Sequence, residues 1–182
     1  MLQGPLVLLG DVETTGLDPH RDRVIDMAFV LTDFHAVYAV LSTYVNPLFD
    51  FARSPTGIEY TEVVQARAPS FSELAPFAHG LLALADEHVF YNHRFDLSFL
   101  QAELARSELR LPRRITRDPF TALRCSLREA CLRYAISVDD IDWHNAIGDA
   151  VALFRLERKL RASAPSAPAP GDAPTTFGPR FA

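Results

Sequence analysis

The pattern of hydrophobic and polar positions along the chain predicts strands first and helices afterwards. Residues 6–9 are four consecutive apolar residues followed by Gly10, a pattern typical of a strand that is buried on both faces. Two segments rich in β-branched and aromatic residues, 23–32 and 37–45, are predicted as the next strands. The loop at 17–22 and the connector between 32 and 37 are shorter than the dozen or so residues of a parallel crossover, so we expect antiparallel neighbours.

Beyond residue 55 the period changes to that of helices alternating with short strands. Ser70 followed by Glu73 has the spacing of a capping box, which indicates a helix start. We expect helices at 56–66, 70–86, 95–109, 121–134 and 145–161, and strands at 88–92 and 114–116. This order predicts an α/β fold in which a mixed sheet, with three antiparallel strands and further parallel ones, is flanked by helices.

Length and composition predict one folded domain and a tail. The chain has 182 residues, of which 48% are hydrophobic, and this is enough for a single sizeable core. From Ala162 the sequence becomes rich in Ala, Ser and Pro, and such a segment buries too little apolar surface to offset its ordering entropy. We therefore expect a folded domain over residues 1–161 and a disordered tail over 162–182. Phe177 and Phe181 near the end indicate either a docking peptide or an ordinary terminus.

Nothing in the sequence predicts a membrane or secreted protein. The N-terminus has no basic leader, and no apolar run approaches the length of a membrane span. Cys125 and Cys131 are the only cysteines, and their spacing suggests neither a disulfide nor a metal site. We expect a soluble cytoplasmic protein with two core thiols and no membrane partner.

Positive charge is concentrated in one segment of an acidic chain. The formal net charge is −5, yet residues 106–133 hold eight Arg against only Glu108, Asp118 and Glu129. Such a segment either binds a polyanion, with metals offsetting the acidic centre, or is a solvated helix surface.

The first predicted strand ends in two acids, Asp11 and Glu13. Side chains two residues apart on a strand share a face, so both carboxylates project together. Like charges at the end of a buried element are costly unless a cation lies between them, and Mg²⁺ or Mn²⁺ suits such oxygen ligands. For this pair alone, the alternative is that Asp11 begins a turn and Glu13 is solvated.

Two further acids lie on the apolar sides of predicted helices. Asp96 shares a helix side with Phe99 and Leu100, which makes it either an N-cap or a functional carboxylate. Asp149 lies on an apolar stripe, where an unpaired buried charge would be strongly destabilising. Asp149 is therefore expected to bind a cation, whereas Asp142 is the better candidate for capping the helix.

His144 is the candidate proton acceptor. It lies five residues before Asp149, and on a continuous helix the two side chains would be roughly 140° apart. They converge only if His144 precedes the helix or lies in its first turn, where a neutral imidazole could take a proton from water. Without such a neighbour, a single His would be an ordinary surface residue.

Three segments in order closely resemble the motifs of the DEDDh, or DnaQ-like, 3′→5′ exonucleases. They are Asp11-Val12-Glu13-Thr14-Thr15-Gly16, Asn92-His93-Arg94-Phe95-Asp96 and His144-Asn145-Ala146-Ile147-Gly148-Asp149-Ala150. The resemblance spans residues 6–160, and all three motifs in order are far more specific than any one of them. It implies a ribonuclease-H-like fold.

The resemblance also implies a role for each motif residue. Two divalent cations, Mg²⁺ or Mn²⁺, would be held by the four acids of the motifs, Asp11, Glu13, Asp96 and Asp149. His144 would act as the general base. A pocket for the terminal nucleotide would be lined by Thr14, Thr15, Gly16, Leu17, Asn92 and Phe95, with Leu17 as an apolar wedge against the last base.

Two positions depart from the pattern of many family members. This chain has Phe90-Tyr91 where many have Ala-His, and Thr56-Gly57-Ile58 where many have His-Gly-Ile. We expect neither segment to touch a metal ligand, and both bear on which substrate end fits the pocket.

The implied function is a metal-dependent 3′→5′ exonuclease that acts on single-stranded or frayed ends, with DNA favoured, in proofreading or repair. Similarity to proofreading subunits also implies a DNA polymerase or clamp partner, bound through the tail. One alternative is an exoribonuclease that trims RNA or short oligonucleotides, because the motifs do not distinguish the sugars. The other is a nuclease-like scaffold that binds nucleic acid or a polymerase without cutting. The sequence has neither a Cys/His zinc set nor a Gly-rich phosphate loop.

Overall fold

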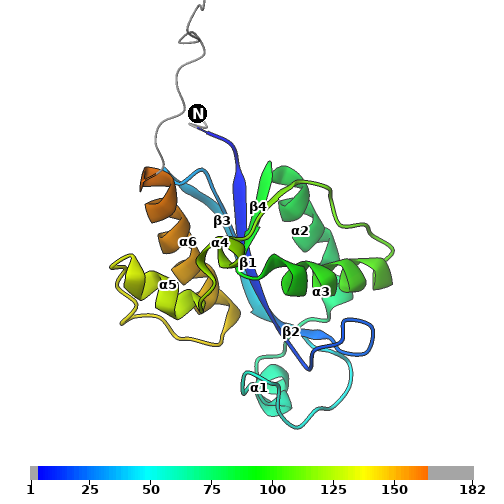
Figure 1. Ribbon diagram of the computed structural model, residues 1–182. Helices are drawn as coiled ribbons and strands as arrows, with labels where there is room; N and C mark the ends of the chain where they lie inside the picture. Colours follow the sequence, from blue (N-terminus) through cyan, green and yellow to red (C-terminus); the bar gives the residue numbers. More distant parts are fainter. Residues whose placement is uncertain (1–3, 164–182) are drawn as a thin grey trace, which may run out of the picture.

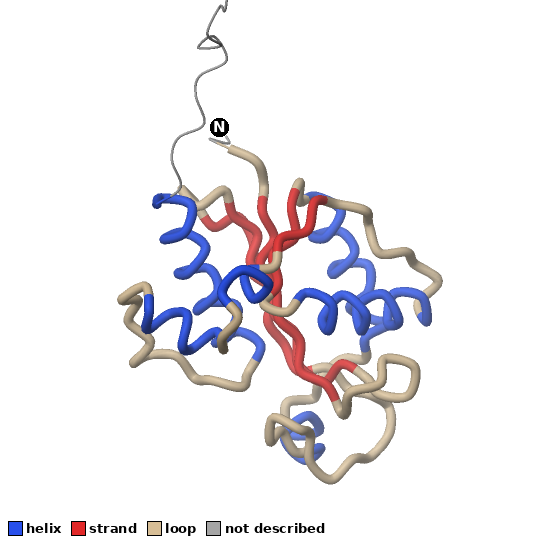
Figure 2. The backbone as a smooth tube through the Cα atoms, in the orientation of Figure 1, coloured by secondary structure: helices blue, strands red, loops and turns tan. Residues whose placement is uncertain are grey.

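A five-stranded mixed sheet forms the centre of the computed structural model, which describes residues 4–163 (Figures 1 and 2). In chain order the strands are β1 (Val7–Thr14), β2 (Val24–Thr32), β3 (Val37–Tyr44), β4 (Glu87–Phe90) and β5 (Ile115–Arg117). Across the sheet the order is β3-β2-β1-β4-β5. β1 is central, antiparallel to β2 and parallel to β4, and β2 is antiparallel to β3. The prediction of a mixed sheet with three antiparallel strands is confirmed.

Helices cover both faces of this sheet. Within residues 4–163 they are α1 (Tyr60–Gln65), α2 (Phe71–Leu84), α3 (His93–Arg106), α4 (Pro119–Leu123), α5 (Leu127–Arg133) and α6 (Ala146–Ser163). Figure 1 shows α5 and α6 on one side of the sheet and α2 and α3 on the other. No helix in this part of the chain is long and apolar enough to cross a membrane. The predicted start of the tail at residue 162 is wrong, because α6 continues to Ser163. The rest of the predicted tail, with Phe177 and Phe181, lies outside the described residues.

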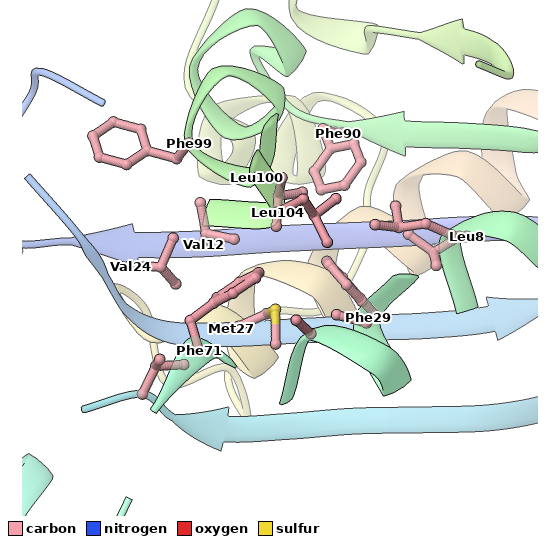
Figure 3. Close-up of a cluster of buried hydrophobic side chains, with 14 of the residues drawn as sticks. Leu8, Val12, Val24, Met27, Phe29, Phe71, Phe90, Phe99, Leu100 and Leu104 are labelled. Carbon is pink, nitrogen blue, oxygen red and sulfur yellow. The ribbon is translucent and has the colours of Figure 1, made fainter. Parts of the chain in front are cut away.

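The main core packs between the sheet and the α2 and α3 layer (Figure 3). Phe29 and Phe90 meet edge to face with ring centroids 6.3 Å apart, and both are fully buried. Gly10 passes between these rings: a Cβ atom added there would lie 2.5 Å from the Phe90 ring and 2.9 Å from Phe29. Close packing at Gly10 therefore holds β1 in place just before Asp11.

Local capping explains where the sequence pattern predicted helices correctly and where it did not. The capping box before α2 is confirmed, because the Ser70 N–H donates to Glu73 Oε2 at 2.8 Å. The helix predicted at 56–66 begins only at Tyr60, since Gly57 has φ of 102° and Glu59 is the N-cap. The predicted start of this helix, at residue 56, is therefore four residues too early.

The single helix predicted at 121–134 is also wrong, because the chain breaks it in two. Arg124 adopts the left-handed conformation, with φ of 55°, and ends α4. Ser126 then caps α5 by accepting the N–H of Glu129 at 3.2 Å. A similar left-handed residue, Asn92 with φ of 68°, ends the strand predicted at 88–92 early and begins α3.

Substitution of Gly10 should destabilise the protein, because any side chain there meets both phenyl rings. We expect Gly10→Ala to lower the free energy of unfolding by about 1–3 kcal/mol, as overpacking of a close-packed core usually does. Gly80→Ala is the matched control: Gly80 is inside α2, and its added Cβ would have nothing within 4 Å. Gly80→Ala should instead gain about 0.5–1 kcal/mol. Urea unfolding measures both, and equal stability of the two variants would contradict this account of the core.

Candidate active site

The carboxylates of Asp11, Glu13 and Asp149 come together beside the second half of β1. One oxygen of each lies within 4.8 Å of one oxygen of the others. Asp11 and Glu13 occupy alternate positions of β1, as predicted, and Asp149 comes from the first turn of α6. Strand and helix thus deliver three acids to one place.

Asp96, the fourth predicted acid, is buried next to this group and is not part of it. Its Oδ1 accepts the N–H of Val12, which lies between the two β1 acids, at 3.2 Å. The N-cap alternative for Asp96 is wrong, because Asn92 is the N-cap of α3. Asp96 therefore joins α3 to β1 at the level of the acids.

One oxygen of this site has no hydrogen-bond partner. Within residues 4–163, Asp149 Oδ1 is the buried side-chain oxygen or nitrogen left without one. A buried unpaired carboxylate oxygen costs several kcal/mol in the absence of a compensating charge. Three converging carboxylates, one of which has an oxygen without a partner, suit a divalent cation such as Mg²⁺ or Mn²⁺. The donor set present in this chain therefore fits a metal.

The pKa values of the acids reflect the same crowding. Burial raises the pKa of Glu13 to about 7, although a hydrogen bond from the Thr56 side chain acts in the opposite direction. Burial also raises the pKa of Asp149 to about 6. The pKa values of Asp11 and Asp96 lie well above their usual range, first through burial and, for Asp11, then through the charge of Asp96. Without a cation, the site retains protons close to neutral pH, and metal binding would release them.

His144 lies at the rim of the acid group. It precedes α6 by two residues, is exposed, and has a left-handed backbone with φ of 66°. Together with Asp11 and Asp149 it lines a pocket of about 400 Å³, whose wall includes Arg128 and Trp143. His144 thus precedes the helix, one of the two placements predicted to bring it close to Asp149.

The two departures from the family pattern lie closer to the acids than expected. The expectation that neither touches a metal ligand is wrong for Thr56, whose side chain hydrogen-bonds to Glu13, a predicted ligand. The loop before α1 brings Thr56 to β1, a contact that strand and helix patterns do not encode. Tyr91 lines the same pocket as His144, and its hydroxyl donates to the carbonyl of Cys125 at 2.6 Å.

The start of α6 is held by residues that the sequence pattern did not single out. Asn145 Oδ1 accepts the N–H of Gly148 at 2.8 Å, so the predicted cap, Asp142, is wrong. Asp142 instead accepts a hydrogen bond from Asn145 Nδ2 at 2.8 Å. Asp26 of β2 accepts the N–H of Ala146 at 2.9 Å. The one signal for Asp26 in the sequence is that it is the only acid in a strand that is otherwise almost entirely apolar.

The predicted nucleotide-pocket residues lie where β1 ends and α3 begins. The Thr14 hydroxyl donates to the carbonyl of Gly16 at 2.6 Å and closes the turn after β1. Leu17 follows with 76% of its surface exposed, which suits a wedge against a base. At the start of α3, the N–H of Asn92 donates to Asp118 at 2.9 Å. The remaining predicted members of this pocket are Thr15 in the same turn and Phe95 in the first turn of α3.

Some of the arginines of residues 106–133 are exposed and also have partners within the fold. Arg114 donates to the carbonyls of Ala83 and Ala85, and Arg117 pairs with buried Glu157 at 2.9 Å. Arg114 and Arg117 thus also connect parts of the fold, while Arg128 lines the pocket beside His144.

Comparison with known proteins identifies the family. The sequence pattern of the family described as Exonuclease matches residues 8–156, most of the described chain. This chain belongs to that exonuclease family. The resemblance to DEDDh, or DnaQ-like, 3′→5′ exonucleases is thereby confirmed, and the domain is a nuclease hydrolase by family.

One named relative and one solved structure are similar to this chain over more than half of its length. A protein named DNA polymerase III PolC-type, from Caldanaerobacter subterraneus subsp. tengcongensis, is 31% identical over 109 residues, which are 56% of this chain and 7% of that protein. E. coli exonuclease I in complex with a dA16 oligonucleotide matches with a TM-score of 0.75 and 19% identity, over 87% of this chain and 41% of that one.

A second solved structure gives the same fold. The zinc-bound form of E. coli exonuclease I with single-stranded DNA has a TM-score of 0.68 and 22% identity, over 88% of this exonuclease chain and 41% of that one. This chain thus spans less than half of either exonuclease I structure. The likeness confirms the predicted ribonuclease-H-like fold.

Stability of the metal-free exonuclease should fall as the pH rises from about 4 to about 7. The pKa of Asp149 is 3.8 in its ordinary state and about 6 in the folded protein, so between these values the folded protein binds the extra proton. A state that binds more protons loses stability as pH rises. Asp149→Asn removes this contribution and should reduce the fall by about 1–3 kcal/mol. Thermal melting in EDTA between pH 4 and 7 tests this. If the melting temperature of wild type and that of Asp149→Asn changed equally from pH 5 to pH 7, the account would be contradicted.

Proposed function

We propose that this exonuclease hydrolyses phosphodiester bonds at single-stranded or frayed 3′ ends of DNA, with two divalent cations, in proofreading or repair. The observation that carries the proposal is the group formed by Asp11, Glu13 and Asp149, in which one buried oxygen has no partner. Such an arrangement is unfavourable for an apolar core and favourable for a cation site.

Each acid has a distinct part in this proposal. Asp11, Glu13 and Asp149 would hold the cations through the oxygens that converge, and buried Asp96, whose charge acts on Asp11, would help to hold the second cation. Paired cations of this kind activate an attacking water and stabilise the leaving oxygen. The hydrogen bond from the Thr56 side chain orients Glu13.

His144 is the general base in this proposal. Its exposed ring lines the pocket shared with Asp11 and Asp149, within reach of a water at the acid group. The ring accepts the proton of that water as the phosphorus is attacked, and the open pocket lets it return the proton to solvent.

The terminal nucleotide occupies the end of the sheet where β1 meets α3. Exposed Leu17 acts as a wedge against its base, and the turn of Thr14, Thr15 and Gly16 supplies the backbone that faces the nucleotide. Asn92 and Phe95 line the other side of that pocket from the start of α3.

Relatives support DNA as the substrate and a polymerase as the partner. The exonuclease I structures contain DNA oligonucleotides, and the PolC-type relative is a DNA polymerase by name. In our proposal the whole protein associates with a DNA polymerase or clamp through residues 162–182. The cytoplasm is the proposed compartment, because both cysteines, Cys125 and Cys131, are unpaired thiols.

Product analysis tests the proposed reaction. We expect stepwise release of mononucleotides from the 3′ ends of labelled single-stranded DNA with Mn²⁺, faster from mispaired than from matched duplex ends. Asp149→Asn should abolish cutting while the protein still melts cooperatively, because the variant loses a ligand and no core packing. Faster degradation of matched RNA would make the enzyme an exoribonuclease, and binding of DNA without any product would make it a scaffold.

Substitution of His144 tests the base assignment. We expect His144→Ala to lose on the order of 10²–10⁴ in kcat, the usual worth of a positioned base, with Mn²⁺ affinity nearly unchanged. His35→Ala is the matched control, since His35 is also exposed and lies in the β2–β3 loop at the far end of the sheet. Parallel loss of Mn²⁺ affinity and rate in His144→Ala would show that His144 is a ligand instead.

A further inference from the structure

We propose that Asp26 is a positioning residue that fixes the start of α6 against β1 and so sets Asp149 and His144 at the acid group. The proposal rests on the proposed function of that group. Asp26 belongs to none of the three motifs and lies 120 residues from its partner in α6.

The contact itself is short and buried. Asp26 is 6% exposed, and its Oδ2 accepts the N–H of fully buried Ala146, the first residue of α6, at 2.9 Å. In the β1 and β2 register, Asp26 is directly opposite Glu13. The hydrogen bond therefore ties the first residue of α6 to the strand position that faces a predicted metal ligand.

Both functional groups of this segment are close to the anchored residue. His144 precedes Ala146 by two residues, and Asp149 follows it by three, within about one helical turn. A shift or fraying of this turn would move both side chains together relative to Asp11. The hydrogen bond to the N–H of Ala146 thus holds both His144 and Asp149 in place relative to Asp11.

The rest of the turn leaves little freedom for another arrangement. Asn145 accepts the N–H of Gly148, and a Cβ atom on Gly148 would clash with the carbonyl oxygen of Asp142. The loop therefore packs directly on the helix. Asp26 supplies the one hydrogen bond in this turn that comes from the sheet.

Asp26 differs from Asp149 in that it has no buried oxygen without a hydrogen-bond partner. It accepts hydrogen bonds from the backbone of Ala146 and of Met27, whereas Asp149 Oδ1 has no partner. Every residue of β2 is buried, so a carboxylate there is costly unless it gains something in return. A helix N-terminus provides that gain, because its free N–H groups and its dipole favour an acceptor with negative charge.

Two substitutions separate the hydrogen bond from the charge. Asp26→Ala removes both, whereas Asp26→Asn removes the charge and keeps an oxygen that can accept the N–H of Ala146. Asp86→Ala is the matched control, since Asp86 also accepts a backbone N–H, that of Leu6 at 2.9 Å, at the opposite end of β1. The full-length variants would be compared by Mn²⁺ titration calorimetry and, without metal, by hydrogen exchange of residues 146–149.

We expect Asp26→Ala to weaken Mn²⁺ binding on the order of tenfold, as loss of a group that orients metal ligands commonly does, and to speed exchange across 146–149. Asp26→Asn and Asp86→Ala should resemble wild type in both measurements. Wild-type exchange in Asp26→Ala would overturn the proposal, and so would an Asp26→Asn protein that binds Mn²⁺ as weakly as the Ala variant.

Folding and function remain distinguishable in this experiment. If Asp26→Ala does not fold, Asp26→Ser takes its place, because its shorter side chain cannot bridge to Ala146. If wild type itself binds no Mn²⁺, the proposed function is wrong, and exchange at 146–149 still decides whether Asp26 holds the helix.

Discussion

Repulsion among buried carboxylates is the constraint on which the rest of this structure depends. Asp11, Glu13 and Asp149 bring oxygens within 4.8 Å of one another, and buried Asp96 adds its charge beside them. Without a cation this arrangement is unfavourable, as the raised pKa values of Glu13 and Asp149 indicate. The fold must therefore hold the acids together by packing elsewhere, and a bound cation would turn the repulsion into attraction.

That packing comes from both faces of one central strand. β1 is buried on both sides, and at Gly10 the rings of Phe29 and Phe90 close on it just before the first acid. α3 delivers Asp96 from one face and α6 delivers Asp149 from the other (Figure 1). Each helix is also joined to a strand near its acid, through the N–H of Val12 for α3 and through Asp26 for α6.

The sequence predicted the parts of this site that depend on local periodicity. Alternation placed Asp11 and Glu13 on one face of a buried strand, and the apolar stripe identified Asp149 as a charge in need of a cation. Contacts across the fold had no such signal: Asp26 reaches α6 from 120 residues away, and Thr56 reaches Glu13 from a loop. The break at Arg124 was missed because a non-glycine residue in the left-handed conformation leaves no mark in composition or hydrophobic pattern.

Anomalous diffraction from crystals grown with Mn²⁺ and a mononucleotide tests the central claim most directly, because it locates the ions relative to individual carboxylate oxygens. The account predicts a Mn²⁺ peak in contact with Asp149 Oδ1 and with Asp11, at the roughly 2.0–2.6 Å typical of hard cations. A peak elsewhere on the protein, with Asp149 Oδ1 still lacking any partner at saturating Mn²⁺, would contradict it.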